Sequence, residues 1–234
     1  MPPPCFKLLR DYESLLGGDR AELKIISKIA EAHGGEINGS KDTIGVLQTS
    51  ERVGNVQIRP RLLASILRFA DEICESRSRA ANYLLRRAVL PRHSEIYHKY
   101  ASVISSSQYE FRERRLYINF ELKVEDITRQ WGKRLRGGNV LEECYLIDEI
   151  FDRLDKMNRE RKYCNLHSRG VYAVESIRAL INVVDDDHDV IEAIPVPELT
   201  DVGYPEDSGR KLKDAEELRE FCGALLADKI RAKV

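Results

Sequence analysis

Residues 58–75, which read IRPRLLASILRFADEICE, decide how the first half of this chain folds. Pro60 suits the first turn of a helix, where a residue without an N–H group loses no hydrogen bond. When successive residues are turned by about 100°, one broad stripe collects the apolar side chains of Leu62, Leu63, Ile66, Leu67, Phe69, Ala70, Ile73 and Cys74. The pattern predicts a core-facing helix.

Asp71 lies at the margin of this stripe, next to Leu67 and Cys74. It does not fall on the solvent side, which carries Arg61 and Arg68. Aspartate is a poor helix former and a sheltered carboxylate loses hydration, so this position favours a partner such as a cation, a helix end or a metal ion. The alternative is a partly solvated residue at the boundary of the core.

The run IRPRLLASILRFADEICESRSRA resembles the segment that carries the last aspartate of the HD superfamily of metal-dependent phosphohydrolases, where a leucine-rich helix ends in a run similar to LR-x-AD-x-(L/I). Upstream, IISKIAEAHGG is similar to the preceding helix of that family, which ends in a histidine. The resemblance covers about Leu23 to Ala80. It implies a helical, HD-like first half, with Asp71 as a metal ligand and His33 near the substrate phosphate or a second metal.

The chain departs from the family pattern in its metal ligands. The family uses a first histidine, an adjacent His-Asp pair and the late aspartate, in that order, and no residue before Asp71 supplies the first two elements. The dipeptide His188-Asp189 lies far downstream inside DDDHD, and we interpret it as a coincidence within a solvated acidic turn. For His33, a satisfied core histidine and a remnant ligand remain equal alternatives.

These residues support two main hypotheses. The resemblance implies an enzyme that uses a divalent metal (Mn, Mg, Ni or Zn) to hydrolyse phosphoesters of nucleotides or nucleic acid, with Arg61, Arg77 and Arg79 contacting phosphates. This chain alone is expected to be inactive, because the missing ligands would have to come from a longer protein or from a protein subunit. The alternative is a non-catalytic regulatory or assembly module that binds a nucleotide, nucleic acid or protein partner through its basic half. A truncated reading frame is a third interpretation.

The net charge of −1 conceals a strong asymmetry along the chain. The segment Arg52–Arg136 carries 18 Lys and Arg against 9 Asp and Glu, whereas Gly137–Asp207 carries 7 against 17. Either the two segments pack against each other, or the basic segment faces a phosphate-bearing partner. The sequence leaves both alternatives open.

Composition and motifs exclude several classes of protein. Hydrophobic residues make up 42% and charged residues 33%, as in ordinary soluble domains. No apolar run approaches the ~18 residues of a membrane span and the N-terminus lacks a signal peptide, so we expect a cytoplasmic protein with no membrane partner. The five cysteines lack C-x-x-C spacing, and no P-loop, G-x-S-x-G or H-E-x-x-H motif occurs.

The second half changes to a period of two. Between Leu116 and Val124 apolar and polar residues alternate, which predicts a half-buried strand. We expect an antiparallel partner over 101–111, a basic linker over 130–138, an amphipathic helix over 140–164, strands over 174–184 and 190–196, and a closing helix over 212–230. The predicted class is α+β, with a helical HD-like domain over 1–97 and a small antiparallel sheet with helices over 98–234.

Overall fold

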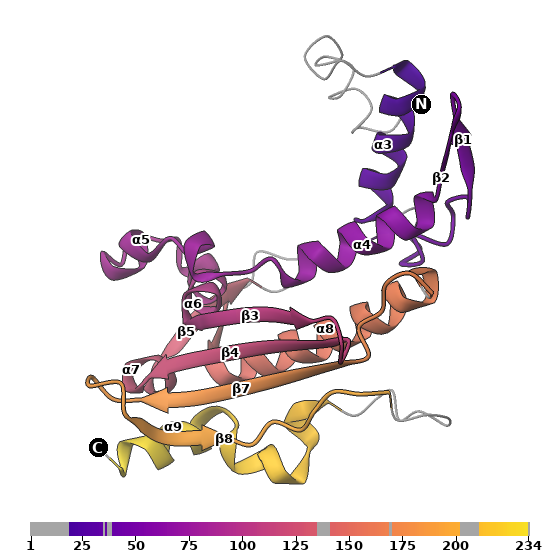
Figure 1. Ribbon diagram of the computed structural model, residues 1–234. Coiled ribbons are helices and arrows are strands. Elements are labelled where there is room, and N and C mark those ends of the chain that lie inside the picture. Colours follow the sequence, from indigo (N-terminus) through magenta and orange to yellow (C-terminus); the bar gives the residue numbers. More distant parts are fainter. Residues whose placement is uncertain are drawn as a thin grey trace. The chain divides into compact units, whose positions relative to one another are not determined.

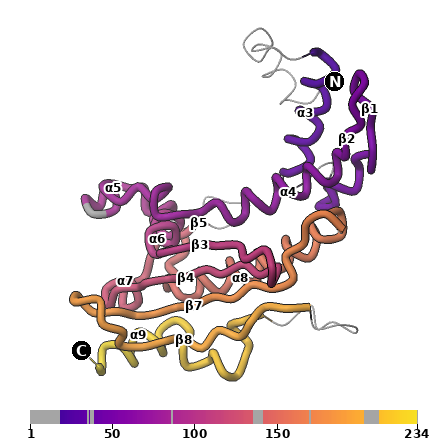
Figure 2. The backbone as a smooth tube through the Cα atoms, viewed as in Figure 1, coloured from indigo at the N-terminus to yellow at the C-terminus, as the bar shows by residue number. Residues whose placement is uncertain are grey.

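The computed structural model describes residues 19–34, 36, 39–134, 141–168, 170–201 and 211–233, which form two compact units (Figures 1 and 2). The first unit contains the described residues up to Ile73 together with Glu160–Ala173. The second unit contains Cys74–Arg159 and the described residues from Val174 onward. The helical pattern of residues 6–16 lies outside the described residues, and the expected domain division after residue 97 stays a prediction.

The first unit begins with helix α3 (Arg20–Ala32). Asp19 caps it, because its side chain accepts a hydrogen bond from the backbone N–H of Ala21. A short hairpin follows, formed by β1 (Glu51–Val53) and β2 (Val56–Ile58) around the positive-φ residue Gly54. The segment that follows α3 therefore contains two paired strands.

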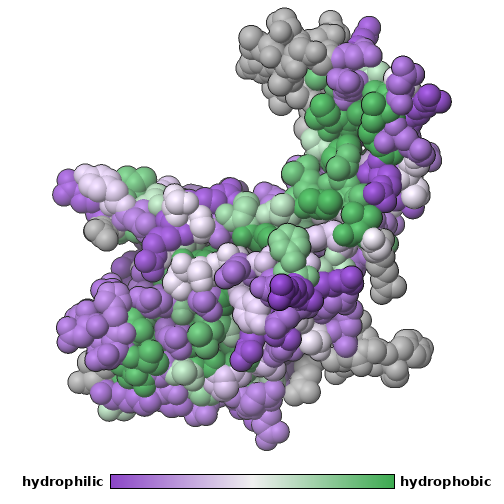
Figure 3. All heavy atoms as spheres, in the orientation of Figure 1, coloured by the Kyte–Doolittle hydropathy of each residue, from purple (hydrophilic) through white to green (hydrophobic). Residues whose placement is uncertain are grey.

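Helix α4 (Pro60–Ile73) is the predicted helix, and only part of its apolar stripe is covered. Leu62, Ser65 and Phe69 are buried. Leu63, Ile66 and Leu67 are 44%, 38% and 40% exposed. Figure 3 shows hydrophobic surface gathered over α3 and α4. The wheel marked the whole stripe as core, because it assigns residues to a face without showing which faces have a neighbouring element.

The second unit begins with short helices. They are the 3-10 helix η1 (Arg77–Arg79), α5 (Asn82–Arg86), the 3-10 helix η2 (Arg92–Ser94) and α6 (Glu95–Val103). Between α5 and η2, Ala88 adopts a left-handed conformation with φ of 51°. An alanine in that region interrupts helical geometry, which separates α5 from the following turn.

A four-stranded sheet forms the centre of the second unit, in the order β3 (Ile104–Glu110), β4 (Arg115–Lys123), β7 (Ser176–Val184) and β8 (Val190–Ile194). The outer pairs are antiparallel, but β4 and β7 are parallel. The expected antiparallel sheet is therefore wrong at its centre. Residues 124–175 connect the two central strands and include helices, and such a crossover permits parallel pairing.

Helix α8 (Leu146–Ser168) covers one face of this sheet with its residues up to Arg159, which belong to the second unit (Figure 1). Buried apolar side chains line both sides of the contact: Leu116, Ile118, Phe120 and Leu122 from β4, Ile177, Ala179, Ile181 and Val183 from β7, and Leu146, Ile147, Ile150, Phe151, Leu154 and Met157 from α8. The core of the second unit lies in this layer. The alternation predicted for β4 is confirmed, since its even-numbered residues from 116 to 122 are buried.

Two further strands replace the expected linker and the start of the long helix. After the short helix α7 (Val124–Thr128), β5 (Gln130–Arg134) pairs with β6 (Leu141–Tyr145), and α8 starts directly after β6. The predicted linker over 130–138 is wrong in its described part. Polar and charged residues dominate these strands, so the sequence lacked an apolar alternation that would have identified them.

The C-terminal segment is capped by carboxylates of α8. It consists of the 3-10 helices η3 (Leu212–Asp214) and η4 (Glu216–Phe221), followed by α9 (Gly223–Arg231), instead of one closing helix. Asp155 accepts a hydrogen bond from the N–H of Leu212, and Asp148 accepts one from the N–H of Gly223. Each carboxylate satisfies an N–H group at the start of a helix, so α8 fixes where these helices begin.

The α+β class is confirmed by this arrangement of helices and small sheets. Within the described ranges, we find no helix with the length and apolarity required to span a bilayer.

Candidate functional site

Asp71 lies in the last turn of α4, and its side chain is exposed. The expected half-sheltered position is therefore wrong. The reason is that the apolar residues on either side of Asp71 in the helical wheel, Leu67 and Cys74, are themselves exposed. An exposed carboxylate at a helix end is accessible to a ligand that approaches from outside the helix.

His33 is the C-cap of α3, and its ring is oriented by its own helix. Its Nδ1 atom forms a short hydrogen bond with the carbonyl oxygen of Ala30. Because a carbonyl oxygen accepts only, Nδ1 must carry the proton, and in neutral histidine the lone pair then resides on Nε2. This is the tautomer in which Nε2 can bind a metal ion or accept a proton.

Arg68 connects the turn after His33 to α4. Its Nη1 group donates to the carbonyl oxygen of Gly34 at 3.2 Å and to the hydroxyl of Thr43 at 2.9 Å. Its Nε and Nη2 groups donate to Glu160 at 2.6 and 3.0 Å, a bidentate ion pair with a residue 92 positions away. These hydrogen bonds to Glu160 raise the pKa of the Arg68 guanidinium, so it stays charged.

Tyr163 and Asp42 form a second polar contact in the first unit. The hydroxyl of Tyr163 donates to Asp42 at 2.8 Å and accepts from the backbone N–H of Ile44 at 2.9 Å. The hydrogen bond from Tyr163 lowers the pKa of Asp42, with a smaller contribution from the N–H of Gly45. His167 meets the Tyr163 ring edge-on, and burial lowers the pKa of His167.

Arg61 lies at the opposite end of α4 from Asp71. Its guanidinium donates to the carbonyl oxygens of Leu47 at 2.6 Å and Gly45 at 2.8 Å, so it fixes the loop before β1. Ten residues of helix separate Arg61 from Asp71, a rise of about 15 Å. The role of Arg61 as a phosphate contact stays a prediction.

Arg77 and Arg79 belong to the second unit, in η1, and both are exposed. Arg77 donates from Nε to the carbonyl oxygen of Ser102 at 3.1 Å. Arg79 donates to the sulfur of Cys74. Each guanidinium keeps further N–H donors beyond these contacts.

The contacts that sequence reasoning missed are those of Arg68, Thr43, Glu160, Tyr163 and Asp42. Arg68 stood within the LR-x-AD run but was assigned to the solvent side of the wheel. Glu160 and Tyr163 lie on a distant helix, and no spacing in the sequence relates them to α4. Only the tertiary structure brings them together.

No cluster of three or more His, Cys, Asp or Glu side chains able to hold a metal ion occurs within the described ranges. The acidic run after β7 forms a turn, in which one Asp185 oxygen accepts from the N–H groups of Asp187 and Asp189 at 3.0 and 2.8 Å. Residues 186–189 of this turn are exposed, which agrees with the interpretation of DDDHD as a solvated turn.

Ion pairs within the chain neutralise part of the charge asymmetry. Several ion pairs among the described residues join the basic segment to the acidic one, and they include Arg68–Glu160, Arg92–Glu143, Arg114–Glu175, Arg115–Glu198, Lys123–Asp186, Lys133–Glu149 and Lys133–Asp152. This pattern favours the alternative in which the two segments pack against each other. It also reduces the number of cations that are available to a phosphate-bearing partner.

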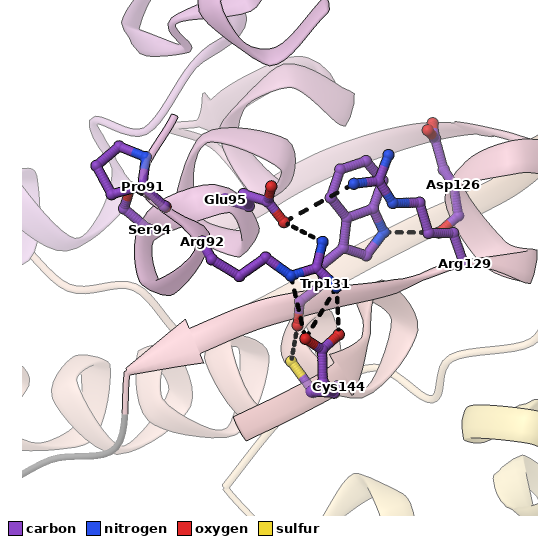
Figure 4. A network of polar contacts seen from close by, with 9 residues as sticks. Pro91, Arg92, Ser94, Glu95, Asp126, Arg129, Trp131 and Cys144 are labelled. Carbon is purple, nitrogen blue, oxygen red and sulfur yellow. Dashed lines mark hydrogen bonds and ion pairs between the residues drawn. The ribbon is translucent and has the colours of Figure 1, made fainter. Parts of the chain in front are cut away.

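Figure 4 shows the network around Arg92, whose guanidinium forms hydrogen bonds with both Glu143 and Glu95. Arg129 lies over the face of the Trp131 ring, with its guanidinium carbon 4.3 Å from the ring centroid, and reaches Glu95 at 3.8 Å. These arginines join η2, α6 and the β5–β6 hairpin. Their role in the described structure is to hold elements together.

Comparison with known proteins places this chain in a family. No curated protein and no solved structure matches the chain. The model of the HD-CE family matches residues 5–156, a range that includes α3, α4 and the first half of α8. The match confirms the expectation of an HD-like protein and extends it well beyond the segment that suggested it. Because it spans more than half of the 234 residues, the chain belongs to the HD-CE family.

Proposed function

We propose that this chain carries part of a metal-dependent phosphohydrolase site of HD type, with Asp71 as a metal ligand and His33 beside it. The substrates would be phosphoesters of nucleotides or nucleic acid. The observation that carries the proposal is the hydrogen bond from Arg68 to the carbonyl oxygen of Gly34. It joins the residue after His33 to a point on α4 that is one turn before Asp71, which supports a common location for the two side chains.

The two proposed ligands make up only part of a metal coordination sphere. One carboxylate and one imidazole fit a divalent ion (Mn, Mg, Ni or Zn) only in part, since metal sites in proteins use three or more protein ligands. A bound metal would supply an activated water and neutralise phosphoryl oxygens. This chain would contribute the carboxylate of Asp71 and the Nε2 atom of His33, and the remaining ligands would come from another protein subunit or from further residues.

The three arginines that are proposed to contact phosphates differ in how many of their N–H donors are already used. Arg77 and Arg79 are exposed, and each retains N–H donors for a phosphate oxygen. Arg61 uses Nε and Nη2 for backbone carbonyls near β1, so its contact with a phosphate would rely on the remaining donors. We keep all three as proposals, with Arg77 and Arg79 ranked above Arg61. A cytoplasmic location remains part of the same proposal.

The second candidate function is a regulatory or assembly module without catalysis. The exposed side chains of Leu63, Ile66 and Leu67 on α4 favour a protein partner for such a module (Figure 3). The ion pairs between the basic and the acidic segment count against nucleic acid as the partner, because a cation that is already paired contributes less to phosphate binding.

The experiment is a titration of the ¹⁵N-labelled chain with Mn²⁺, which broadens NMR signals near a binding site even when binding is weak. We expect selective broadening around His33–Gly34 and Arg68–Cys74, because two ligands retain the ion only briefly. The substitution Asp71→Asn should abolish this pattern. Glu22→Gln, which changes an exposed acid in the first turn of α3, is the matched control and should leave it unchanged.

Two results would contradict the proposal. If Asp71→Asn leaves the Mn²⁺ broadening unchanged, Asp71 is not a metal ligand. The regulatory or assembly module would then be the remaining candidate function. Tight, stoichiometric binding by calorimetry would show that the site in this chain is complete, and the expected inactivity of the chain alone would be wrong.

A further inference from the structure

We propose that Arg68 is the positioning residue of this site, which fixes both the turn that carries His33 and the tautomer of its ring. This inference rests on the proposed function for its link to metal binding. Its link to His33 is independent of any metal, and the experiments below separate the two.

The guanidinium of Arg68 is held on three sides. Its Nε and Nη2 groups donate to Glu160, and its Nη1 group donates to Thr43 and to the carbonyl oxygen of Gly34. The centroid of the Tyr163 ring lies 4.8 Å from the guanidinium carbon. The Arg68 side chain is only 11% exposed. A planar fork with this many fixed partners has one orientation, which is the requirement for a residue that positions others.

Arg68 supports the end of α3 directly and through Thr43. The hydroxyl of Thr43 donates to the carbonyl oxygen of Ala32 at 2.5 Å, and the Arg68 guanidinium donates to that hydroxyl and to the carbonyl oxygen of Gly34. The carbonyls on both sides of His33 are therefore bound to groups that depend on Arg68. The carbonyl oxygen of Ala30, one turn earlier in α3, accepts from the His33 ring.

The same side chain is close to Asp71 along the helix. Residues three apart share a face of a helix and differ by about 4.5 Å in rise. Arg68 thus lies three residues before Asp71 on α4, and its hydrogen bond holds the carbonyl oxygen of Gly34, the residue after His33. Lysine would keep the positive charge near Glu160 but would lose the fork that reaches Gly34 and Thr43 at once.

The test compares Arg68→Lys with Arg61→Lys. Both arginines lie on α4 and both donate to backbone carbonyls of the segment between α3 and β2, so Arg61→Lys is a matched control that is remote from Asp71. The first readout is the pair of ¹⁵N shifts of the His33 ring in the metal-free chain. Arg68→Lys should replace the single Nδ1–H tautomer by a mixture, and Arg61→Lys should not.

The second readout is the Mn²⁺ concentration that half-broadens the signals of His33 and Asp71. We expect Arg68→Lys to raise it by about tenfold, as for other residues that orient metal ligands. Thr43→Val removes the bridging hydroxyl without changing a charge. It should change both the His33 shifts and the half-broadening Mn²⁺ concentration in the same direction as Arg68→Lys. This variant replaces Arg68→Lys in the test if Arg68→Lys does not fold.

Two outcomes would overturn the inference: wild-type His33 shifts in both Arg68→Lys and Thr43→Val, or equal changes in Arg68→Lys and Arg61→Lys. The outcomes for the proposed function are separate. If Asp71→Asn leaves Mn²⁺ broadening intact, the phosphohydrolase proposal fails, while the metal-free His33 shifts still decide whether Arg68 positions the ring.

Discussion

The carbonyl oxygen of Arg92 lies so close to Gly132 that a Cβ atom on residue 132 would be 2.2 Å from it. The conflict is with backbone, so a side-chain rotation cannot relieve it. Gly132→Ala should therefore push η2 away from β5 and lower the free energy of unfolding by about 1–3 kcal/mol. Urea unfolding followed by circular dichroism measures this change.

Gly170→Ala is the comparison for that prediction. Nothing lies within 4 Å of a Cβ at residue 170, and only its φ of +85° opposes a side chain. Its loss should be about 1 kcal/mol, the cost of a left-handed conformation for an L-residue. An equal or larger loss for Gly170→Ala would show that the contact between η2 and β5 is loose.

Tyr163→Phe should raise the pKa of Asp42. The hydrogen bond from the Tyr163 hydroxyl is the largest cause that lowers this pKa, and phenylalanine keeps the ring beside Arg68 while removing the hydroxyl. The backbone N–H of Ile44 would also lose its acceptor, which should cost about 1 kcal/mol of stability. A ¹³C titration of the Asp42 carboxyl measures the shift, and an unchanged pKa would refute the contact.

Acid should weaken the packing of His167 against Tyr163. Because burial lowers the pKa of His167 in the folded state, the unfolded chain binds a proton first as the pH falls. The stabilising contribution is complete above the ordinary pKa of about 6.5 and is lost as the pH falls through the folded value. The slope of unfolding free energy against pH should be smaller in His167→Gln, and an NMR titration should place the His167 pKa below 6.5.

Asp148 has the opposite dependence on pH. Burial raises its pKa, so ionisation is disfavoured in the folded state, and the stability gained by the protonated form is lost as the pH rises through the folded value. Asp148→Asn removes this dependence and keeps an oxygen for the N–H of Gly223. Asp148→Ala removes the oxygen and should cost about 1 kcal/mol. If both variants are equally stable, the cap on α9 contributes nothing.

The sequence predicted correctly those features that depend only on neighbouring residues in the chain. The alternation in β4 and Pro60 at the start of α4 depend on local geometry, and both were predicted correctly. The β5–β6 hairpin was missed because its position depends on the backbone contact between Gly132 and Arg92, which leaves no periodic signal.

The candidate site shows the same division. The family resemblance pointed to His33 and Asp71, but the exposure of Asp71 depends on which faces of α4 find neighbours. The role of Arg68 depends on Glu160, far along the chain. A helical wheel places both residues correctly on α4 and has no information about the elements packed against it.

The parallel pairing of β4 with β7 has a consequence for the order in which the second unit assembles. The hairpins β3–β4 and β7–β8 join strands that are neighbours in sequence, so each can form early. The two hairpins can pair only when residues 124–175 bring β4 and β7 together. Closing a loop of that length costs conformational entropy before any contact between the strands compensates for it. The pairing of β4 with β7 is therefore expected to be the last part of this unit to form. Until then, the unpaired edges of β4 and β7 can form non-native strand pairs.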